Sequence, residues 1–157
     1  MKKIKLLTMI MLLVLCLTLT SCAKEVTEDE FYDKLSQTEE SPYKTAKVST
    51  TSKSSKETKT ENYTIDLETM KIDGEASLTG YFMTGLIKGS KLALVSVVSA
   101  IQLGGGSVTY YAGSTFKVEA KNNDQEIVME LNQYGLLTYY KTVSDDGTST
   151  TRISYSK

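Results

Sequence analysis

The sequence predicts an α+β fold in which an antiparallel sheet is covered on its apolar face by an N-terminal helix and a mid-chain helix. Three observations predict it. Apolar and polar side chains alternate between turn signals over residues 108–155, residues 27–38 begin with helix-capping signals, and residues 92–103 repeat apolar side chains at helical spacing. A sheet with one apolar face needs a cover, and these two helices can supply it.

The N-terminal helix is predicted from its capping residues. Thr27 can cap the helix, and Glu30 stands three residues later, as in a capping box. Pro42 cannot continue a helix. We therefore expect the helix to run over residues 27–38.

The next segment has an unusual composition. Residues 49–61 are almost wholly Ser, Thr, Lys and Glu, which suits either a flexible linker or a solvent-exposed hairpin. The hairpin is favoured, because Tyr63, Ile65 and Leu67 then resume the period of two that marks a strand.

The mid-chain helix is predicted over residues 92–103, where Leu94, Val98 and Ile101 fall on one side. Its β-branched side chains leave a strand as an alternative, and an earlier start near Met83 also stays open. The following strands form an antiparallel meander, because short turn signals separate them.

The start of the chain is predicted to be a secretory leader. Three lysines stand among the first five residues, and the apolar stretch that follows is too short for a permanent membrane span. Leu19, Thr20, Ser21 and Cys22 then resemble the lipobox of bacterial lipoproteins, which is an apolar residue, two small residues and a cysteine. An ordinary secreted protein with an unmodified cysteine is the alternative.

The lipobox resemblance implies that diacylglycerol is attached to the sulfur of Cys22 and that residues 1–21 are removed. Two acyl chains suffice for stable anchoring. Residues 22–26 would form a short tether, with a reach under roughly 20 Å at about 3.5 Å per extended residue, and residues 27–157 the single domain. We therefore expect a lipid-anchored domain close to the extracytoplasmic face of the cell membrane.

Composition argues against several functions. Loss of the three leader lysines leaves fifteen of eighteen basic residues against nineteen acidic ones, a net charge of −4 that does not suit nucleic-acid binding. The sequence has no histidine, and its two cysteines are Cys16, inside the leader, and Cys22. We therefore predict no catalytic residue, metal site or cofactor, and rank an enzyme last. Chemistry by a pair of carboxylates stays formally open.

The layout as a whole resembles small lipoproteins of Gram-positive bacteria, mostly without known function. It combines a lipobox, a capped helix, a long hairpin, a mid-chain helix and a meander ending in Ile-Ser-Tyr-Ser at residues 153–156. Residues 132–137 (Asn-Gln-Tyr-Gly-Leu-Leu) look like their recurring Tyr-Gly-Leu turn. The arrangement is also similar to LolA/LolB-like folds. That similarity implies a sheet curved into an incomplete barrel, with an apolar concavity that binds acyl chains.

Two functions therefore compete. The first is a non-enzymatic binding domain that holds a lipid, a lipidated partner or a peptide against the apolar face of the sheet. The side chains expected to line that site are Phe116, Val118, Ile127, Met129, Leu137 and Tyr139. An ordinary filled core is the alternative for these residues. The second function is a structural lipoprotein that contacts another envelope protein through the hairpin of residues 49–61.

Overall fold

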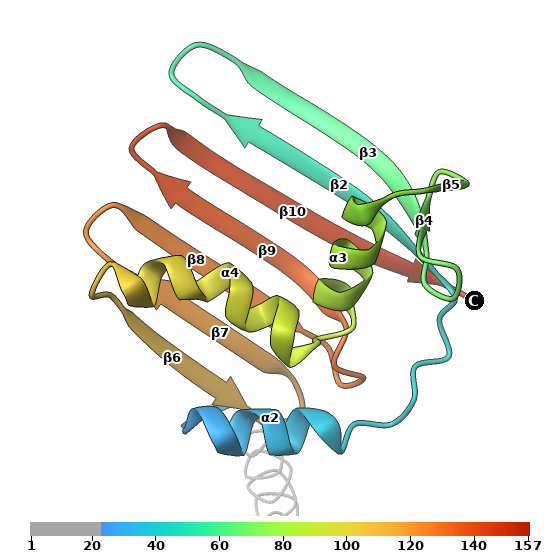
Figure 1. Ribbon diagram of the computed structural model, residues 1–157, viewed down its shortest axis with the longest axis horizontal. Coiled ribbons are helices and arrows are strands. Elements are labelled where there is room, and N and C mark those ends of the chain that lie inside the picture. The colour runs from blue at the N-terminus through green and yellow to red at the C-terminus, as the bar shows by residue number, and fades with distance from the viewer. Residues whose placement is uncertain (1–22) are drawn as a thin grey trace, which may run out of the picture.

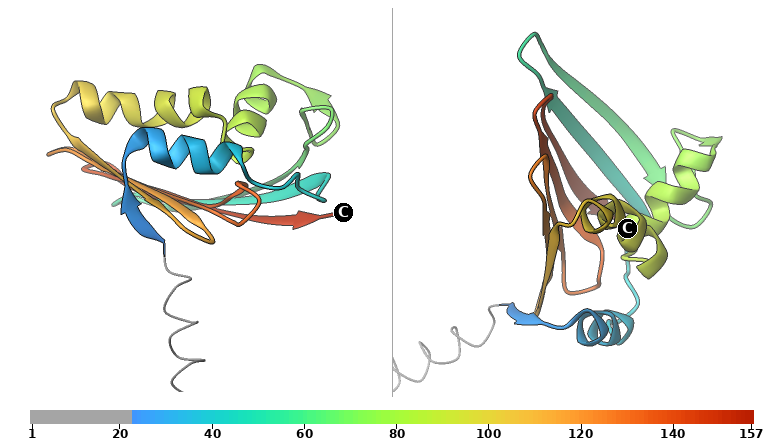
Figure 2. Two further views of the ribbon diagram at one scale, coloured as in Figure 1. Left: turned by 90° about the horizontal axis from the view of Figure 1, so that it is seen from below. Right: turned by 60° about the vertical axis from the view of Figure 1, so that its left-hand side comes forward.

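The computed structural model describes residues 23–157, which form one open, curved sheet with helices against it (Figure 1). Ten strands pair antiparallel in the order β1-β6-β7-β8-β9-β10-β2-β3-β4-β5. Figure 2 shows the sheet nearly edge-on, with all three helices on the same side of it. The predicted α+β class and the curved, open antiparallel sheet are confirmed.

The helices are α2 (Glu28–Ser36), α3 (Leu78–Ile87) and α4 (Lys91–Leu103). The strands are β1 (Lys24–Val26), β2 (Thr45–Lys53), β3 (Thr58–Asp66), β4 (Lys71–Ile72), β5 (Glu75–Ala76), β6 (Ser107–Ala112), β7 (Phe116–Lys121), β8 (Gln125–Leu131), β9 (Leu137–Ser144) and β10 (Gly147–Ser156). From β6 to β10 each strand pairs with the next one along the chain. Strand β10 then pairs with β2, so the early hairpin β2–β3 extends the C-terminal meander.

Most of the segment expected as a tether, residues 22–26, belongs to the sheet as strand β1. Lys24 lies opposite Ala112, and the pairing with β6 continues to the end of β1. Helix α2 follows directly, and Thr27 Oγ1 accepts the main-chain N–H of Glu30 at 3.3 Å. The folded domain therefore starts with β1, three residues before the expected start at Thr27.

Residues 49–61 form most of the hairpin β2–β3, so the hairpin prediction is confirmed and the linker alternative is wrong. Its hydroxyl groups bond across the strands. Thr50 Oγ1 lies 2.9 Å from Thr151 Oγ1 on β10, and Thr51 Oγ1 lies 3.2 Å from Thr60 Oγ1 on β3. Such cross-strand threonine pairs stabilise a sheet where few apolar side chains are available to pack.

The mid-chain helix is confirmed as α4, but a separate helix, α3, precedes it. Ser77 Oγ caps α3 by accepting the N–H of Gly80 at 3.0 Å. The chain then turns at Gly89, where φ is +65°, and the axes of α3 and α4 meet at 94°. The apolar sequence before residue 92 thus belongs to a second helix and not to an earlier start of α4.

Helix α2 is fixed to the sheet by a cluster of aromatic rings. Phe31 is fully buried, and its ring centre lies 5.2 Å from that of Tyr32, 5.1 Å from that of Tyr110 and 5.7 Å from that of Phe116. Aromatic side chains bury large areas and contribute strongly to a small core. The cluster therefore holds α2 against β6 and β7.

Candidate functional site

Five of the six side chains expected to line a lipid cavity lie in a filled core. Their exposed fractions are only 0–5%: Phe116, Val118, Ile127, Met129 and Leu137. They form one cluster with the buried side chains of α2 and α4. An acyl-sized cavity would leave solvent-sized space beside them, which such low exposure does not allow. The apolar face of the sheet is therefore occupied by the helices at these positions.

The sixth residue, Tyr139, lies on the opposite face of the sheet, so that prediction is wrong. A β-bulge between Glu130 and Leu131 gives β9 one extra residue relative to β8. One extra residue reverses the alternation of side chains, so Tyr140 packs against the core and Tyr139 points outward. The guanidinium of Arg152 lies 5.8 Å from the centre of the Tyr139 ring on that outer face.

The predicted lipid attachment site lies outside the described residues. The same is true of the whole cleavage motif, Leu19, Thr20, Ser21 and Cys22. The described chain starts at Ala23, next to the predicted attachment site.

Helices α3 and α4 form the most apolar exposed surface of the described domain. Five large apolar side chains there are 46–89% exposed: Leu78, Tyr81, Phe82, Leu92 and Leu103. We call these five side chains the helical apolar surface. A single exposed apolar side chain is ordinary on a protein surface, but a group confined to two adjoining helices indicates an interaction site.

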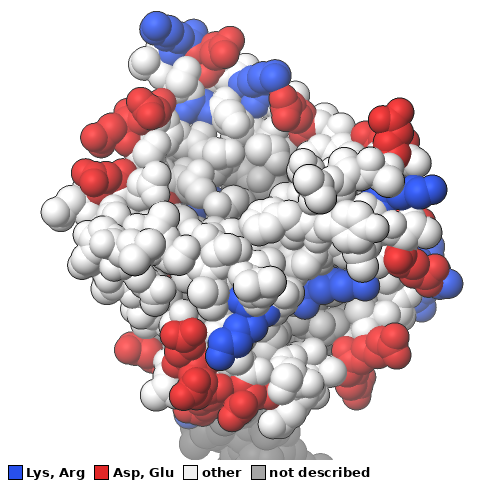
Figure 3. Space-filling model, in the orientation of Figure 1, with Lys and Arg blue, Asp and Glu red and all other residues white. Residues whose placement is uncertain are grey.

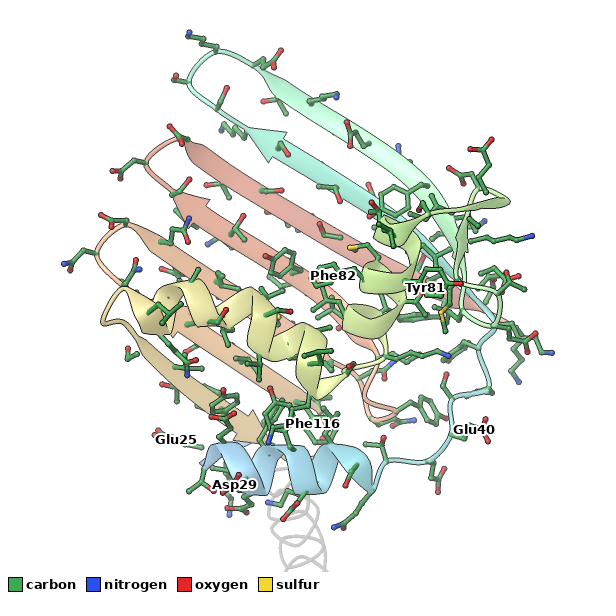
Figure 4. All side chains as sticks on the ribbon, viewed as in Figure 1. Glu25, Asp29, Glu40, Tyr81, Phe82 and Phe116 are labelled. Carbon is green, nitrogen blue, oxygen red and sulfur yellow. The ribbon has the colours of Figure 1, made fainter. Side chains whose placement is uncertain are left out.

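The helical apolar surface arises because both helices are apolar on their outer sides as well as on the sides that face the core. Leu92 and Leu103 stand eleven residues apart, about three turns, and therefore lie on one side of α4. Figure 4 shows Tyr81 and Phe82 on α3, away from Phe116 in the core. A helix that is apolar all round is usually covered on every side. This signal was present in the sequence, although the strand patterns alone do not reveal it.

The charges around this surface have one sign. No Asp or Glu occurs between Glu75 and Glu119, whereas Lys88 and Lys91 stand at the junction of α3 and α4. Lys91 Nζ lies 4.7 Å from the centre of the Tyr32 ring on α2. Figure 3 shows an uncharged band across this face, with acidic side chains around its margins. The helical apolar surface is therefore bordered by positive charge at the helix junction.

Ionisable groups with shifted pKa values lie beneath α2 and not at this surface. Burial, together with the nearby Glu28 carboxylate, raises the pKa of Tyr110 to about 12, and burial also raises the pKa of Tyr32. Both phenols belong to the aromatic cluster that holds α2. Within residues 23–157, no three His, Cys, Asp or Glu side chains gather closely enough to hold a metal ion. The described residues thus offer a docking surface more clearly than a reaction centre.

Two solvent-open hollows lie elsewhere on the domain. One, of about 440 Å³, lies between β2, β3 and β10 and includes Lys47, Asn62 and Arg152. The other, of about 480 Å³, lies along the connection from α2 to β2 and includes Tyr43 and Tyr134. Neither is lined by the side chains expected to bind a lipid.

No described helix is long and apolar enough on its own to cross a membrane, and α3 and α4 meet that test only as a sharply bent pair. Comparison of the chain with protein-family models and with curated proteins gives no match. The helical apolar surface is therefore the feature of the described domain that best supports a function.

Proposed function

We propose that this chain is a lipid-anchored extracytoplasmic lipoprotein and that its domain is a non-enzymatic module that binds another envelope protein. The observation that carries the proposal is the helical apolar surface, whose five large side chains face solvent. Burying a large apolar side chain contributes roughly 1.5–3 kcal/mol. A partner that covers even part of this surface therefore gains appreciable binding free energy.

The anchoring part of the proposal rests on the order of sequence features. A basic start, an apolar stretch and the lipobox ending at Cys22 follow one another within the first 22 residues. Strand β1 begins two positions later, at Lys24. Lipid on Cys22 would thus hold the β1 edge of the sheet directly at the membrane.

The direction of β1 favours a protein over the anchoring bilayer as the occupant of the helical apolar surface. Figure 2 shows β1 rising from the far side of the sheet to α2, while α3 and α4 lie on the helix side. For the same bilayer to cover α3 and α4, position 22 would have to pass the sheet and a helix, which is about 10 Å wide by itself. One residue, Ala23, spans only about 3.5 Å. The surface therefore faces away from the anchor.

The charge pattern defines the chemistry of the partner. Lys88 and Lys91 border the helical apolar surface, and α3 and α4 contain no acidic side chain. A complementary segment presents apolar side chains flanked by carboxylates, because opposite charges at the rim of an interface favour encounter and set orientation. We therefore infer an apolar, acid-flanked segment of an envelope protein as the ligand.

Photo-crosslinking in the cells that naturally express the chain tests this proposal. A photoreactive amino acid replaces Leu92 or Leu103 in the full-length protein, and the crosslinked peptides are sequenced. We expect one protein adduct that maps to an apolar, acid-flanked segment. Lys88→Glu should reduce that adduct, whereas Lys47→Glu, the same change on the other face of the sheet, should not.

Three results would contradict the proposal. Adducts with lipid alone would identify a bilayer as the occupant. The same adduct from a probe at Thr138, on the outer face of the sheet, would show that contact does not depend on α3 and α4. Mass spectrometry that found an intact leader or a free thiol at Cys22 would remove the anchor.

A further inference from the structure

Strand β3 has an open edge in the part of the sheet that projects beyond the helices. Its pairing with β4 is confined to Ile65 opposite Ile72, at the end near α3. Residues 58–62 pair with β2 on one side, and on the other side no described strand pairs with them. Figure 1 shows this stretch along the free upper margin of the sheet. An unpaired strand edge is a template for another strand unless the protein blocks it.

The main-chain hydrogen bonds show which residues of β3 point outward. Thr64 exchanges bonds with Asp73, which lies outside the β2–β3 pair, whereas the Glu57 carbonyl accepts the N–H of Ser54 at the β2 side. The β2–β3 register is continuous over the whole hairpin. Outward and inward groups alternate along a strand, so Thr58, Thr60 and Asn62 present their N–H and C=O groups to the open edge.

We propose that this edge pairs antiparallel with the same edge of a second copy of the chain, with Thr60 opposite Thr60 of that copy. A two-fold axis there lets Thr58 and Asn62 of opposite copies exchange main-chain hydrogen bonds, as outward-pointing groups require. Lys59 then stands opposite Glu61 of the other copy, and Glu61 opposite Lys59. The edge is therefore complementary to itself.

Charge selects this register over its neighbours. If the two-fold axis moved by one residue toward the N-terminus, Lys59 would face Lys59. If it moved by one residue the other way, Glu61 would face Glu61, and like charges directly opposite are destabilising. Within one chain Lys59 Nζ already lies 2.5 Å from Glu61 Oε1, so both charges occupy the same face of β3. Pairing of two copies would join these ion pairs into a four-charge cluster.

The pairing is limited to a short stretch, which fits an association aided by a shared membrane. Beyond Asn62 the outward groups of Thr64 are already bonded to Asp73, so the open edge ends there. Few apolar side chains would be buried along it. Confining two copies to one membrane raises their effective concentration without any new contact. The inference draws on the proposed anchor in this respect only, and it is independent of the helical apolar surface.

Disulfide formation in membranes of cells that produce the full chain tests the register. Thr60→Cys should form a dimer on oxidation, because directly opposed residues of hydrogen-bonded strands lie about 5.5 Å apart between Cα atoms. Thr58→Cys alone should not, whereas Thr58→Cys mixed with Asn62→Cys should. The parent chain is the control for its own cysteines. Mass measurement of Cys22 in the same preparation separates loss of anchoring from loss of pairing.

Charge reversal in trans gives the sharper test. Lys59→Glu and Glu61→Lys, each combined with Thr60→Cys, should lower the dimer yield roughly fivefold or more when expressed alone, because like charges then face each other. Co-expression of the two variants should restore the yield, since every carboxylate at position 59 or 61 of one chain would then face an ammonium group of the other. Repulsion within each chain is unchanged by mixing, so it cannot produce the rescue.

Three results would overturn the inference. The first is equal dimer yield from Thr58→Cys and Thr60→Cys, which would indicate random collision. The second is a crosslink from Thr60→Cys to a different protein in place of a second copy, which would assign the edge to another strand. The third is absence of rescue in the mixed charge variants, which would remove the proposed register.

Discussion

The carbonyl oxygen of Gly135 lies 2.7 Å from the point where a Cβ on Gly89 would stand. Gly89 forms the turn between α3 and α4, and Gly135 lies in the turn between β8 and β9. The side chain of Leu35 on α2 touches the same place from the third side. The bend that positions the helical apolar surface is thus held by a contact with the end of the sheet that only glycine permits.

Gly89→Ala should lower the free energy of unfolding by about 2–4 kcal/mol. The positive φ of +65° costs an alanine about 1–2 kcal/mol, and the close approach to Gly135 adds a clash that must be relieved by displacement. Gly105→Ala is the matched control, because Gly105 has φ +74° but nothing within 4 Å of the added carbon. Urea unfolding should show a loss near 1 kcal/mol for the control. Equal losses would mean that the contact is not tight.

Two phenylalanines separate stability from docking. Phe31→Ala should cost about 3–5 kcal/mol, because Phe31 is fully buried among aromatic rings and truncation leaves a cavity. Phe82→Ala removes the same atoms from a side chain that is 46% exposed, so its cost should stay below about 1 kcal/mol. Phe82→Ala should nevertheless weaken the protein adduct formed from a photoreactive probe at Leu92. A folded Phe82→Ala variant with an undiminished adduct would argue against docking on α3.

Thr84→Val should raise the free energy of unfolding by about 1 kcal/mol. Thr84 on α3 is 1% exposed, and its hydroxyl has no hydrogen-bond partner among the described residues. Valine keeps the shape and removes a buried polar group that is costly to desolvate. Thr84→Ser is the control, since it keeps the hydroxyl and loses a packed methyl, and it should be destabilising. A lower urea midpoint for Thr84→Val would mean that water satisfies the hydroxyl.

Alkaline pH should destabilise the domain through its buried phenols. Burial holds the pKa of Tyr110 at about 12, above the ordinary value of about 10. The folded state therefore keeps its proton where the unfolded state has lost it, so stability is complete below pH 10 and falls as pH rises towards 12. Urea midpoints measured between pH 9 and 12 should decline less steeply for Tyr110→Phe. Tyr81→Phe, at an exposed tyrosine, should leave the decline unchanged.

The sequence predicts those elements whose pattern is local. The alternation from Phe116 to Ala120 and the capping signal at Thr27 each depend on neighbouring residues, and both appear in the structure. Strand β1 depends on an unpaired edge of β6, which lies far along the chain, so its three residues have no signal of their own. Helix α3 contains Gly80 and Gly85, which have low helix propensity, and its packing against the rest of the domain outweighs that preference.

The candidate site was harder to predict than the fold, because exposure depends on what covers a segment. Periodicity places Met129 on the apolar face of the sheet, but it cannot show whether a helix or a ligand fills the space above it. The structure answers with α4 and exposes the far side of that helix at Leu92 and Leu103. The absence of acidic residues between Glu75 and Glu119 is visible in the sequence and becomes informative only once α3 and α4 are known to be exposed.

The β-bulge supplies the last prediction, because it exchanges the roles of two adjacent tyrosines. Tyr140 packs against the core, and burial raises its pKa, whereas Tyr139 lies on the outer face beneath Arg152. Tyr140→Ala should therefore cost about 2–4 kcal/mol of unfolding free energy, and Tyr139→Ala about 1 kcal/mol or less, the worth of an exposed cation–π contact. Urea unfolding of the two variants under identical conditions decides the matter. A strictly alternating strand would give the reverse order, with Tyr139 the costly position, and that result would remove the bulge.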